Sequence, residues 1–218
     1  MAKKAIAIIG AGGRMGSAIA RSLAKGNYRL LLFSSDTDKL NILVKEIERT
    51  NLNADIECIG CPFDASWEAD IIIPAIPFKA EKEIADQIRQ VSTGKIVISI
   101  ANPLNESSDG LITAPETSAA EELQKLLPDS KVVKAFNTTF AGDFSQLLID
   151  GKQADAFIAG NDEEAVQTVE EMVRIAGFNP IAAGKLSVSR ILENMQLLLI
   201  QLNTKYNYKW IAGWKILH

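Results

Sequence analysis

The chain has 218 residues, a formal net charge of −4 and no basic run, so neither nucleic acid nor an anionic membrane surface is an expected partner. Its apolar runs are all shorter than the roughly 18 residues that cross a bilayer, and a cytoplasmic protein is predicted. A chain of this length can bury a sizeable core without a metal or a disulfide.

The N-terminal segment carries the clearest functional signal. An apolar run at residues 5–9 leads directly into a glycine-rich stretch, Gly10-Ala11-Gly12-Gly13-Arg14-Met15-Gly16. Glycines after a strand let the backbone approach a dinucleotide pyrophosphate, whose phosphates bind the N–H groups that open the next helix. The spacing is G-x-x-G-x-x-G, whereas G-x-G-x-x-G is commoner. A strand-turn-helix joint without a ligand is the simpler interpretation, but the position after an N-terminal strand favours dinucleotide binding.

Short apolar runs then alternate with amphipathic segments along the chain. Strands are expected at residues 5–9, 29–33, 54–58, 70–74, 96–100, 132–135, 154–159 and 178–181. Helices are expected at residues 14–25, 37–49, 79–91, 118–127, 162–175 and 191–206. This alternation predicts an α/β fold with a doubly wound parallel sheet. We divide the chain into a NAD(P)-binding domain with extra C-terminal strands, residues 1–185, and a small helical extension, residues 186–218.

The segment after the second strand bears on the choice of dinucleotide. Ligands of a doubly wound sheet collect at the carboxyl ends of its strands, where an NAD-preferring protein places an acid for the ribose hydroxyl. Ser34 stands at that place, and Ser35 and Lys39 add a donor and a positive charge, so NADP(H) is favoured over NAD(H). Two alternatives stay open: Asp36 or Asp38 fills the acidic role, or the segment only caps the next helix.

Rigid, neutral segments follow the fourth and fifth strands. They are predicted to line the nicotinamide ribose and ring with backbone and small side chains, leaving room for a second planar molecule. The residues concerned are Ala75, Ile76, Pro77 and Phe78 after one strand and Asn102 and Pro103 after the other. The alternative is that these prolines only end the strands.

Cys58 and Cys61 form a C-x-x-C pair after a predicted strand. Such pairs occur in thiol redox couples and as half of a zinc site. A zinc site needs about four ligands, and the only histidine is His218. Because no helix is expected to begin at this pair, ordinary apolar packing is favoured over redox chemistry, and no metal is predicted.

Few side chains are available for acid–base chemistry near the predicted pocket. The sequence has one histidine and no expected cluster of acids or bases there, which disfavours a dehydrogenase that deprotonates an alcohol. Lys134 lies on a core strand, where alternation places it equally well at a solvated strand end. Hydride transfer between stacked rings needs only alignment and exclusion of water, so no catalytic side chain is predicted.

The last predicted helix, residues 191–206, carries more apolar surface than an isolated exposed helix tolerates. It either completes the core or forms an interface, and a homodimer through this helix is predicted. Trp210 and Trp214 follow it. They are expected to anchor the tail by burial, with an aromatic lid over the pocket as the alternative.

Several strings together resemble the NADP oxidoreductase family that depends on the deazaflavin coenzyme F420. They are the glycine turn, Ile76-Pro77-Phe78, Asn102-Pro103, the segment Lys131-Val132-Val133-Lys134-Ala135-Phe136-Asn137-Thr138-Thr139 and Arg190-Ile191-Leu192-Glu193. The resemblance implies a Rossmann fold that binds NADP(H), with Ala135 and Asn137 at the cofactor. Two departures are visible: Ser35 and Asp36 replace the family's arginines, and Thr138-Thr139-Phe140 replaces an apolar-proline continuation.

The predicted function is that of an NADP(H)-dependent oxidoreductase. It transfers a hydride between the nicotinamide and a flavin-type or F420-like acceptor by direct stacking. The alternatives are a non-catalytic NADP(H)-binding redox sensor and an NADPH-dependent ferric or flavin reductase, the latter by similarity to the cytosolic domain of ferric-reducing membrane oxidoreductases. An open cavity walled by Ile76, Phe78, Asn137 and Phe140 would favour an enzyme over a sensor.

Overall fold

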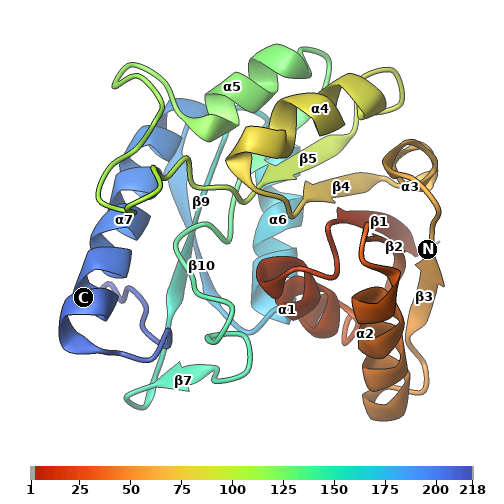
Figure 1. Ribbon diagram of the computed structural model, residues 1–218, viewed down its shortest axis with the longest axis horizontal. Helices are drawn as coiled ribbons and strands as arrows, with labels where there is room; N and C mark the ends of the chain where they lie inside the picture. The colour runs from red at the N-terminus through yellow and green to blue at the C-terminus, as the bar shows by residue number, and fades with distance from the viewer. Residues whose placement is uncertain (1–2, 218) are drawn as a thin grey trace.

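The computed structural model describes residues 3–217, and an eight-stranded sheet with helices on both faces runs through its centre (Figure 1). The strands lie in the order β10-β9-β6-β5-β4-β1-β2-β3. Their bounds are β1 (Lys4–Ile9), β2 (Tyr28–Phe33), β3 (Asp55–Cys58), β4 (Ile71–Pro74), β5 (Ile96–Ser99), β6 (Lys131–Lys134), β9 (Asp155–Gly160) and β10 (Asn179–Gly184). The first six follow the Rossmann order, which confirms the predicted fold class.

Two strands, β9 and β10, run against the other six, contrary to the all-parallel sheet that the sequence predicts. All neighbouring pairs from β3 to β6 are parallel, but β9 is antiparallel to β6. The reason lies in the connection. Between these two strands the chain forms a loop and the hairpin β7 (Leu148–Ile149) and β8 (Lys152–Gln153) instead of a crossover helix. A parallel neighbour needs such a crossover.

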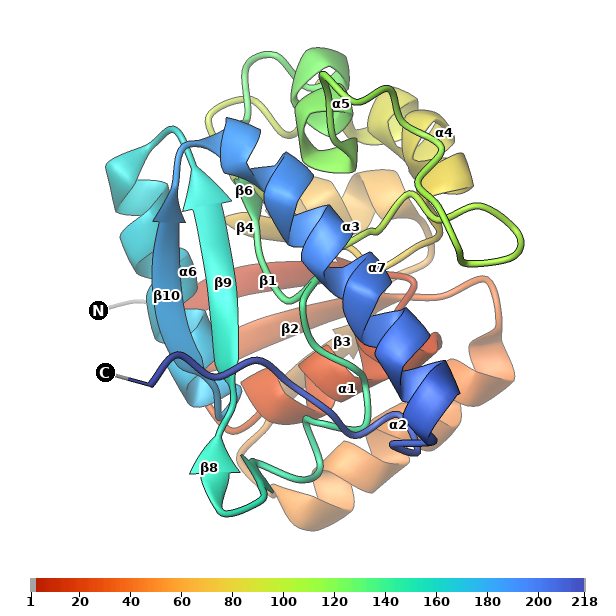
Figure 2. The same ribbon diagram turned by 90° about the vertical axis from the view of Figure 1, so that its left-hand side faces the viewer.

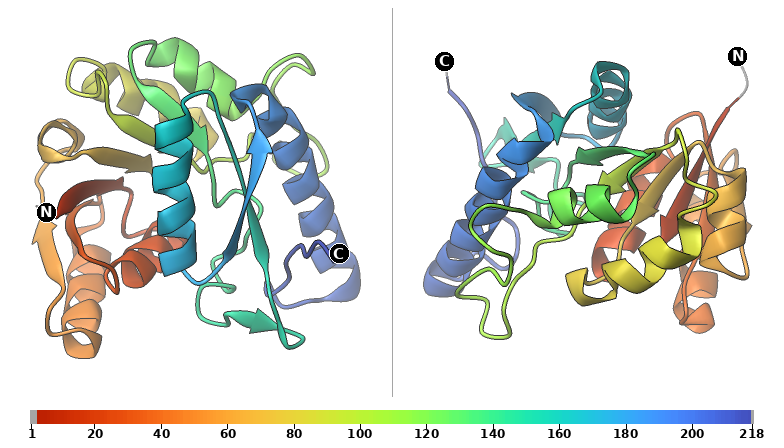
Figure 3. Two further views of the ribbon diagram at one scale, coloured as in Figure 1. Left: turned by 180° about the vertical axis from the view of Figure 1, so that it is seen from behind. Right: turned by 90° about the horizontal axis from the view of Figure 1, so that it is seen from above.

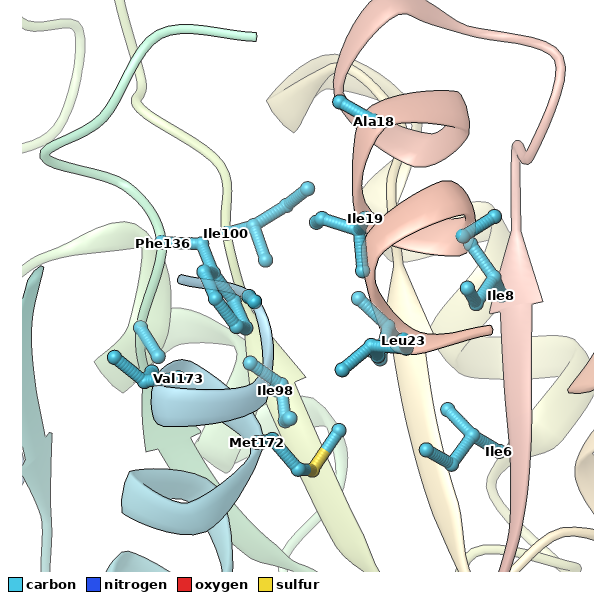
Figure 4. Close-up of a cluster of buried hydrophobic side chains, with 14 of the residues drawn as sticks. Ile6, Ile8, Ala18, Ile19, Leu23, Ile98, Ile100, Phe136, Met172 and Val173 are labelled. Carbon is cyan, nitrogen blue, oxygen red and sulfur yellow. The ribbon is translucent and has the colours of Figure 1, made fainter. Parts of the chain in front are cut away.

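The two faces of the sheet are covered by different helices. The helices α1 (Arg14–Leu23), α2 (Thr37–Thr50) and α6 (Glu163–Ile175) pack on one face, and α3 (Pro62–Glu68), α4 (Phe78–Ile88) and α5 (Ala119–Leu126) on the other. Successive residues of β1 point to opposite faces, so Ile6 and Ile8 join the first cluster and Ala7 and Ile9 the second. Figure 4 shows the first cluster, whose side chains from β1, α1, β5 and α6 face one another.

The C-terminal part lies beside the strands β9 and β10. After the short 3-10 helix η1 (Leu186–Val188), the helix α7 (Ser189–Tyr206) crosses the sheet on the side away from α6 (Figures 2 and 3). Leu192 packs there against Phe157 of β9. No helix among residues 3–217 is long and apolar enough to cross a membrane.

The tail that follows α7 is held at the start of β9. The buried carboxylate of Asp155 accepts hydrogen bonds from the Lys215 ammonium at 2.7 Å and from the Ile216 backbone N–H at 2.6 Å. The Asp155 N–H donates to the carbonyl of Trp214 at 2.8 Å, and the Trp214 ring packs against two apolar clusters. Trp214 therefore anchors the tail, as expected from the sequence.

The sequence analysis missed the helix α3, and with it the setting of the cysteines. Cys61 is the N-cap of α3, and its sulfur accepts a hydrogen bond from the Asp64 N–H at 3.4 Å. The statement that no helix begins at the C-x-x-C pair was therefore wrong. The helix has only seven residues and starts with Pro62, which suits a first helical position but gives a weak periodic signal.

Candidate functional site

The glycine turn lies where the strand order reverses, between the ends of β2 and β4. The backbone N–H groups of Gly10 and Ala11 both donate to the Phe33 carbonyl, at 2.8 and 2.9 Å. Gly10 has a φ of +89°, and a Cβ there would lie 2.5 Å from the carbonyl oxygen of Ala75. Only glycine fits this position, because the left-handed backbone and the neighbouring strand both exclude a side chain.

Two helices that start at this point lack a side-chain cap. Gly13 is the N-cap of α1 and Pro77 that of α4, and neither caps its helix through a side-chain hydrogen bond. By contrast, Asp36, Ser118 and Asp162 cap α2, α5 and α6 with their side chains. The first-turn N–H groups of α1 and α4 are thus not taken by a capping side chain, which suits binding of an anion such as a pyrophosphate.

The predicted ribose segment lies beside the turn, and its Asp36 and Lys39 are paired with each other. A Cβ on Gly12 would lie 2.5 Å from the Ser34 hydroxyl and 3.4 Å from the Cβ of Lys39. Asp36 caps α2 and pairs with the Lys39 ammonium at 2.7 Å, and this bond holds the pKa of the Asp36 carboxyl below its usual value. The helix-capping interpretation is therefore correct for Asp36, whose two carboxyl oxygens lie at the Lys39 N–H and at the Lys39 ammonium.

A cleft of about 300 Å³ opens next to the start of α1. Four residues predicted to bind the cofactor line it together: Arg14, Met15, Asn102 and Asn137. Phe140, predicted as a wall, lines it as well. The other lining residues are Ile100, Phe136, Thr139, Ala141, Gly142, Gln196 and Trp210. The cleft thus joins the glycine-turn helix to the end of β5, the loop after β6, α7 and the C-terminal tail.

Two residues that line this cleft, Asn137 and Gln196, have buried amide oxygens without a partner among the described residues. The Asn102 and Asn137 side chains bond reciprocally, since each Nδ2 donates at 3.0 Å, one to the Asn137 carbonyl and one to the Asn102 Oδ1. The Asn137 Nδ2 also donates to the Leu192 carbonyl at 3.1 Å. Among the described residues, the Asn137 Oδ1 and the Gln196 Oε1 have no partner. Buried acceptors of this kind suit a ligand with an amide N–H.

Aromatic side chains form the outer wall. Phe136 has a φ of +58°, a conformation that a non-glycine residue adopts only under constraint, and it turns the chain away from β6. Phe140 meets Trp210 edge to face, with ring centroids 5.2 Å apart. Trp210 is half exposed, so its ring faces both the cleft and solvent. The expected anchoring by burial is therefore wrong for Trp210, which lines the cleft, and holds for Trp214.

The remaining predicted residues lie outside the lining of this cleft. Ala135 and Pro103 are buried behind it, and Ser35 is exposed at the start of α2. Ile76 and Phe78 flank the start of α4, with the Ile76 side chain 3.0 Å from a Cβ built on Gly10. Ile76 borders the glycine turn, and neither residue lines the cleft around Phe140.

Sequence reasoning missed Gln196, and it placed Trp210 near the pocket only as an alternative. The signal for Gln196 was present, because Glu193, Gln196 and Asn203 are polar positions on one face of an otherwise apolar helix, and all three are buried. Trp210 reaches the cleft because the tail returns to it: the Trp210 carbonyl lies 2.6 Å from a Cβ built on Gly142.

The expectation that no cluster of ionisable groups lies near the pocket was wrong. Lys134 and Glu193 are fully buried and form an ion pair of 2.6 Å, directly behind Asn102 and Asn137. Glu81 is buried beside them. Lys134 is therefore not at a solvated strand end. His218 lies outside the described residues.

Comparison with known proteins agrees with this geometry. The sequence model described as "NADP oxidoreductase coenzyme F420-dependent" matches residues 5–103. The chain is 34% identical to the F420-dependent NADP reductase of Methanocaldococcus jannaschii, covering 94% of each protein, and 27% identical to that of Methanothermobacter marburgensis, covering 92% of each. A solved candidate F420-dependent NADP reductase from Arthrobacter sp. FB24 shares the fold, with a TM-score of 0.81 over 99% of both chains at 21% identity.

Proposed function

Because this chain belongs to the family of coenzyme F420-dependent NADP oxidoreductases, we propose that it passes a hydride between NADP(H) and a deazaflavin of the F420 type inside the cleft at the start of α1. The observation that carries this proposal is the continuity of the site. Arg14 and Met15 are the first residues of the helix that follows the glycine turn. Both also line the cleft, together with Asn137 and Phe140. A dinucleotide with its pyrophosphate on the turn would therefore direct its other end into the cleft.

The dinucleotide would be held mainly by backbone groups. Residues 10–16 supply the close approach and the first-turn N–H groups of α1, and Ala75, Ile76 and Pro77 border the same turn. Preference for NADP(H) is supported by the Ser34 hydroxyl beside Gly12 and by the engagement of Asp36 with Lys39. A carboxylate that already accepts two bonds from Lys39 has fewer acceptor positions left for a ribose hydroxyl.

At the nicotinamide end, the residues of the chain bind and orient without taking part in bond making. The free Oδ1 of Asn137 and the free Oε1 of Gln196 fit the N–H groups of a carboxamide or of a deazaflavin ring. When bound, the nicotinamide supplies or accepts the hydride. Phe140 and Trp210 would cover the second ring, exclude water and hold it in contact with the first.

The space around the cleft supports an acceptor with a long substituent. A second cleft of about 650 Å³ shares Arg14, Ala141 and Gly142 with the first and continues along α1 past Arg21 and Lys25. A ring in the smaller cleft could extend its substituent there. This favours a deazaflavin or flavin nucleotide over a bare ferric chelate as the direct acceptor.

We also propose that residues 1–185 bind the dinucleotide, that residues 186–218 complete the acceptor pocket, and that α7 joins two copies of the chain. Ile191 and Leu198 are 61% and 46% exposed and lie seven residues apart, on one face of the helix. A second copy of α7 would cover them. Light scattering tests this, because Leu198→Glu should halve the mass of a dimer.

The test of the function is a titration followed by turnover. Purified protein is titrated with NADPH and with NADH by fluorescence, and coenzyme F420, a flavin or a ferric chelate is then added while the nicotinamide absorbance is recorded. The proposal expects tighter binding of NADPH and its rapid oxidation by F420. Binding without oxidation by any acceptor would support the redox-sensor alternative, and faster oxidation by ferric chelate the metalloreductase alternative.

A further inference from the structure

The cluster behind the cleft is built around a buried lysine. Lys134 is the last residue of β6 and is fully buried. Its ammonium donates to the Glu193 carboxylate at 2.6 Å and to the backbone carbonyl of Ala101. Ala101 directly precedes Asn102, which lines the cleft. The ammonium therefore holds the chain at the carboxyl end of β5 in place.

Glu193 connects the same lysine to two helices. It lies in the first turns of α7, and its second oxygen accepts the N–H of Ala119, the first residue of α5, at 3.1 Å. The neighbouring carbonyl of Leu192 accepts from Asn137. Both oxygens of the Glu193 carboxylate are thus engaged, and this pair connects β6, α5 and α7 behind the two asparagines. Removing one partner would leave an uncompensated buried charge.

Glu81 is the third member, and it has no hydrogen-bond partner. It lies in the first turn of α4 with 3% of its surface exposed, and among the described residues neither carboxyl oxygen is bonded. Its electrostatic neighbours are Lys134, which favours its charge, and Glu193, which opposes it. Burial outweighs the lysine and raises the pKa of Glu81 to about 7.

Charge balance assigns the proton within this cluster. One ammonium neutralises one carboxylate, and a second buried carboxylate would be left uncompensated in a medium of low polarity. Glu193 already accepts from Lys134 and from Ala119, so its charge is stabilised. Glu81 accepts nothing, so the proton belongs on Glu81.

We propose that Lys134 and Glu193 are positioning residues that fix Asn102 and Asn137 for the nicotinamide, and that this arrangement requires Glu81 to carry a proton. The inference rests on the proposed function. When Glu81 loses its proton, a second carboxylate competes for the Lys134 ammonium and weakens its bond to the Ala101 carbonyl. Asn102 then loses its fixed place, and the nicotinamide end binds less well.

The charged groups that face Glu81 come from two elements, Lys134 of β6 and Glu193 of α7. One further buried acid titrates in the same range near the cleft. Asp143 accepts from the N–H groups of Phe140 and Ala212, and burial raises its pKa to about 7. Any experiment on pH must therefore separate Glu81 from Asp143.

The experiment measures the dissociation constant of NADPH by fluorescence between about pH 6 and pH 8.5. In the wild-type protein we expect it to rise about tenfold across this range, because NADPH binds better when Glu81 carries its proton. Glu81→Gln keeps the side chain neutral and should abolish the rise while retaining tight binding. Glu83→Gln, an exposed neighbour on α4, is the matched control and should follow the wild type.

Glu193→Gln gives a second, independent readout. It removes the negative charge that opposes ionisation of Glu81, so Glu81 becomes the only acid beside the lysine and loses its proton at lower pH, and the rise should move to lower pH. A merely structural role would change the melting temperature without moving this profile. The inference is overturned if Glu81→Gln keeps the wild-type rise, or if Asp143→Asn alone removes it. Absence of NADPH binding at every pH would instead overturn the proposed function itself.

Discussion

The two ends of the candidate site are built in different ways. The dinucleotide end is made by backbone over one short stretch, where Gly10 and Ala11 bond to Phe33 and a helix begins without a side-chain cap. The acceptor end is made by side chains that come from α1, β5, the loop after β6, α7 and the tail. The dinucleotide end needs only the right residue at each position of one turn. The acceptor end, in contrast, depends on the packing of the whole chain.

The largest effect on binding is expected from a substitution that opens the glycine turn at the dinucleotide end. In Gly10→Ala the new methyl group meets the Ala75 carbonyl at 2.5 Å in a left-handed backbone conformation, so the turn must open. NADPH binding should weaken about a thousandfold or more, roughly 4 kcal/mol, as measured by fluorescence titration.

Gly60→Ala is the matched control. Gly60 lies on an exposed turn with nothing within 4 Å of an added Cβ, so binding should not change. Thermal unfolding of both variants separates loss of the fold from loss of the site. Wild-type affinity in a folded Gly10→Ala protein would show that the turn does not hold the pyrophosphate.

The assembled end should respond to pH through Asp143, which bonds the tail at Ala212 to the loop at Phe140. Burial raises its pKa to about 7 in the folded protein, against roughly 4 in an unfolded chain. Its stabilising contribution is therefore complete below about pH 4, falls as the pH rises, and is lost above about pH 7. Relative to the wild type, Asp143→Asn should gain roughly 4 kcal/mol of unfolding free energy over this interval.

Denaturant titrations at several pH values measure this difference. Asp86→Asn, on the exposed side of α4, should leave the curve parallel to that of the wild type. A constant difference between Asp143→Asn and wild type would mean that the carboxyl does not hold a proton in the folded chain.

A smaller effect, on acceptor binding alone, should show that the two ends of the site bind different ligands. Trp210→Ala removes the ring that meets Phe140 edge to face at the cleft. We expect the KM for the acceptor to rise about tenfold, while the NADPH dissociation constant stays within about twofold. Steady-state kinetics and titration give the two values.

Trp67→Ala on α3 is the control for loss of a tryptophan, because that ring is 66% exposed on the other face of the sheet. If Trp210→Ala weakened NADPH and acceptor equally, the division of the site into two ends would be wrong.

The sequence predicts the parts of this molecule that are formed within short segments, and it does not predict the parts that depend on distant residues. The strand-glycine-helix turn and the eight strands of the main sheet are encoded within short segments, and they were predicted. The direction of β9 was not, because it depends on a connection without a helix. The burial of Lys134 was left open, since one charged residue at a strand end gives no sign of the carboxylate that meets it 59 positions later.

The smallest effect concerns the choice between the dinucleotides. Lys39 is 66% exposed and already paired with Asp36, so its ammonium adds little to a 2′-phosphate. Lys39→Ala should raise the NADPH dissociation constant about threefold and leave that of NADH unchanged, whereas Lys45→Ala on the exposed side of the same helix should alter neither. A much larger loss of NADPH affinity would show that the Lys39 ammonium leaves Asp36 when NADPH binds. The Asp36 carboxylate would then be free to move toward the ribose. Equal weakening of NADPH and NADH would instead place the role of Lys39 in the helix cap, which both dinucleotides share.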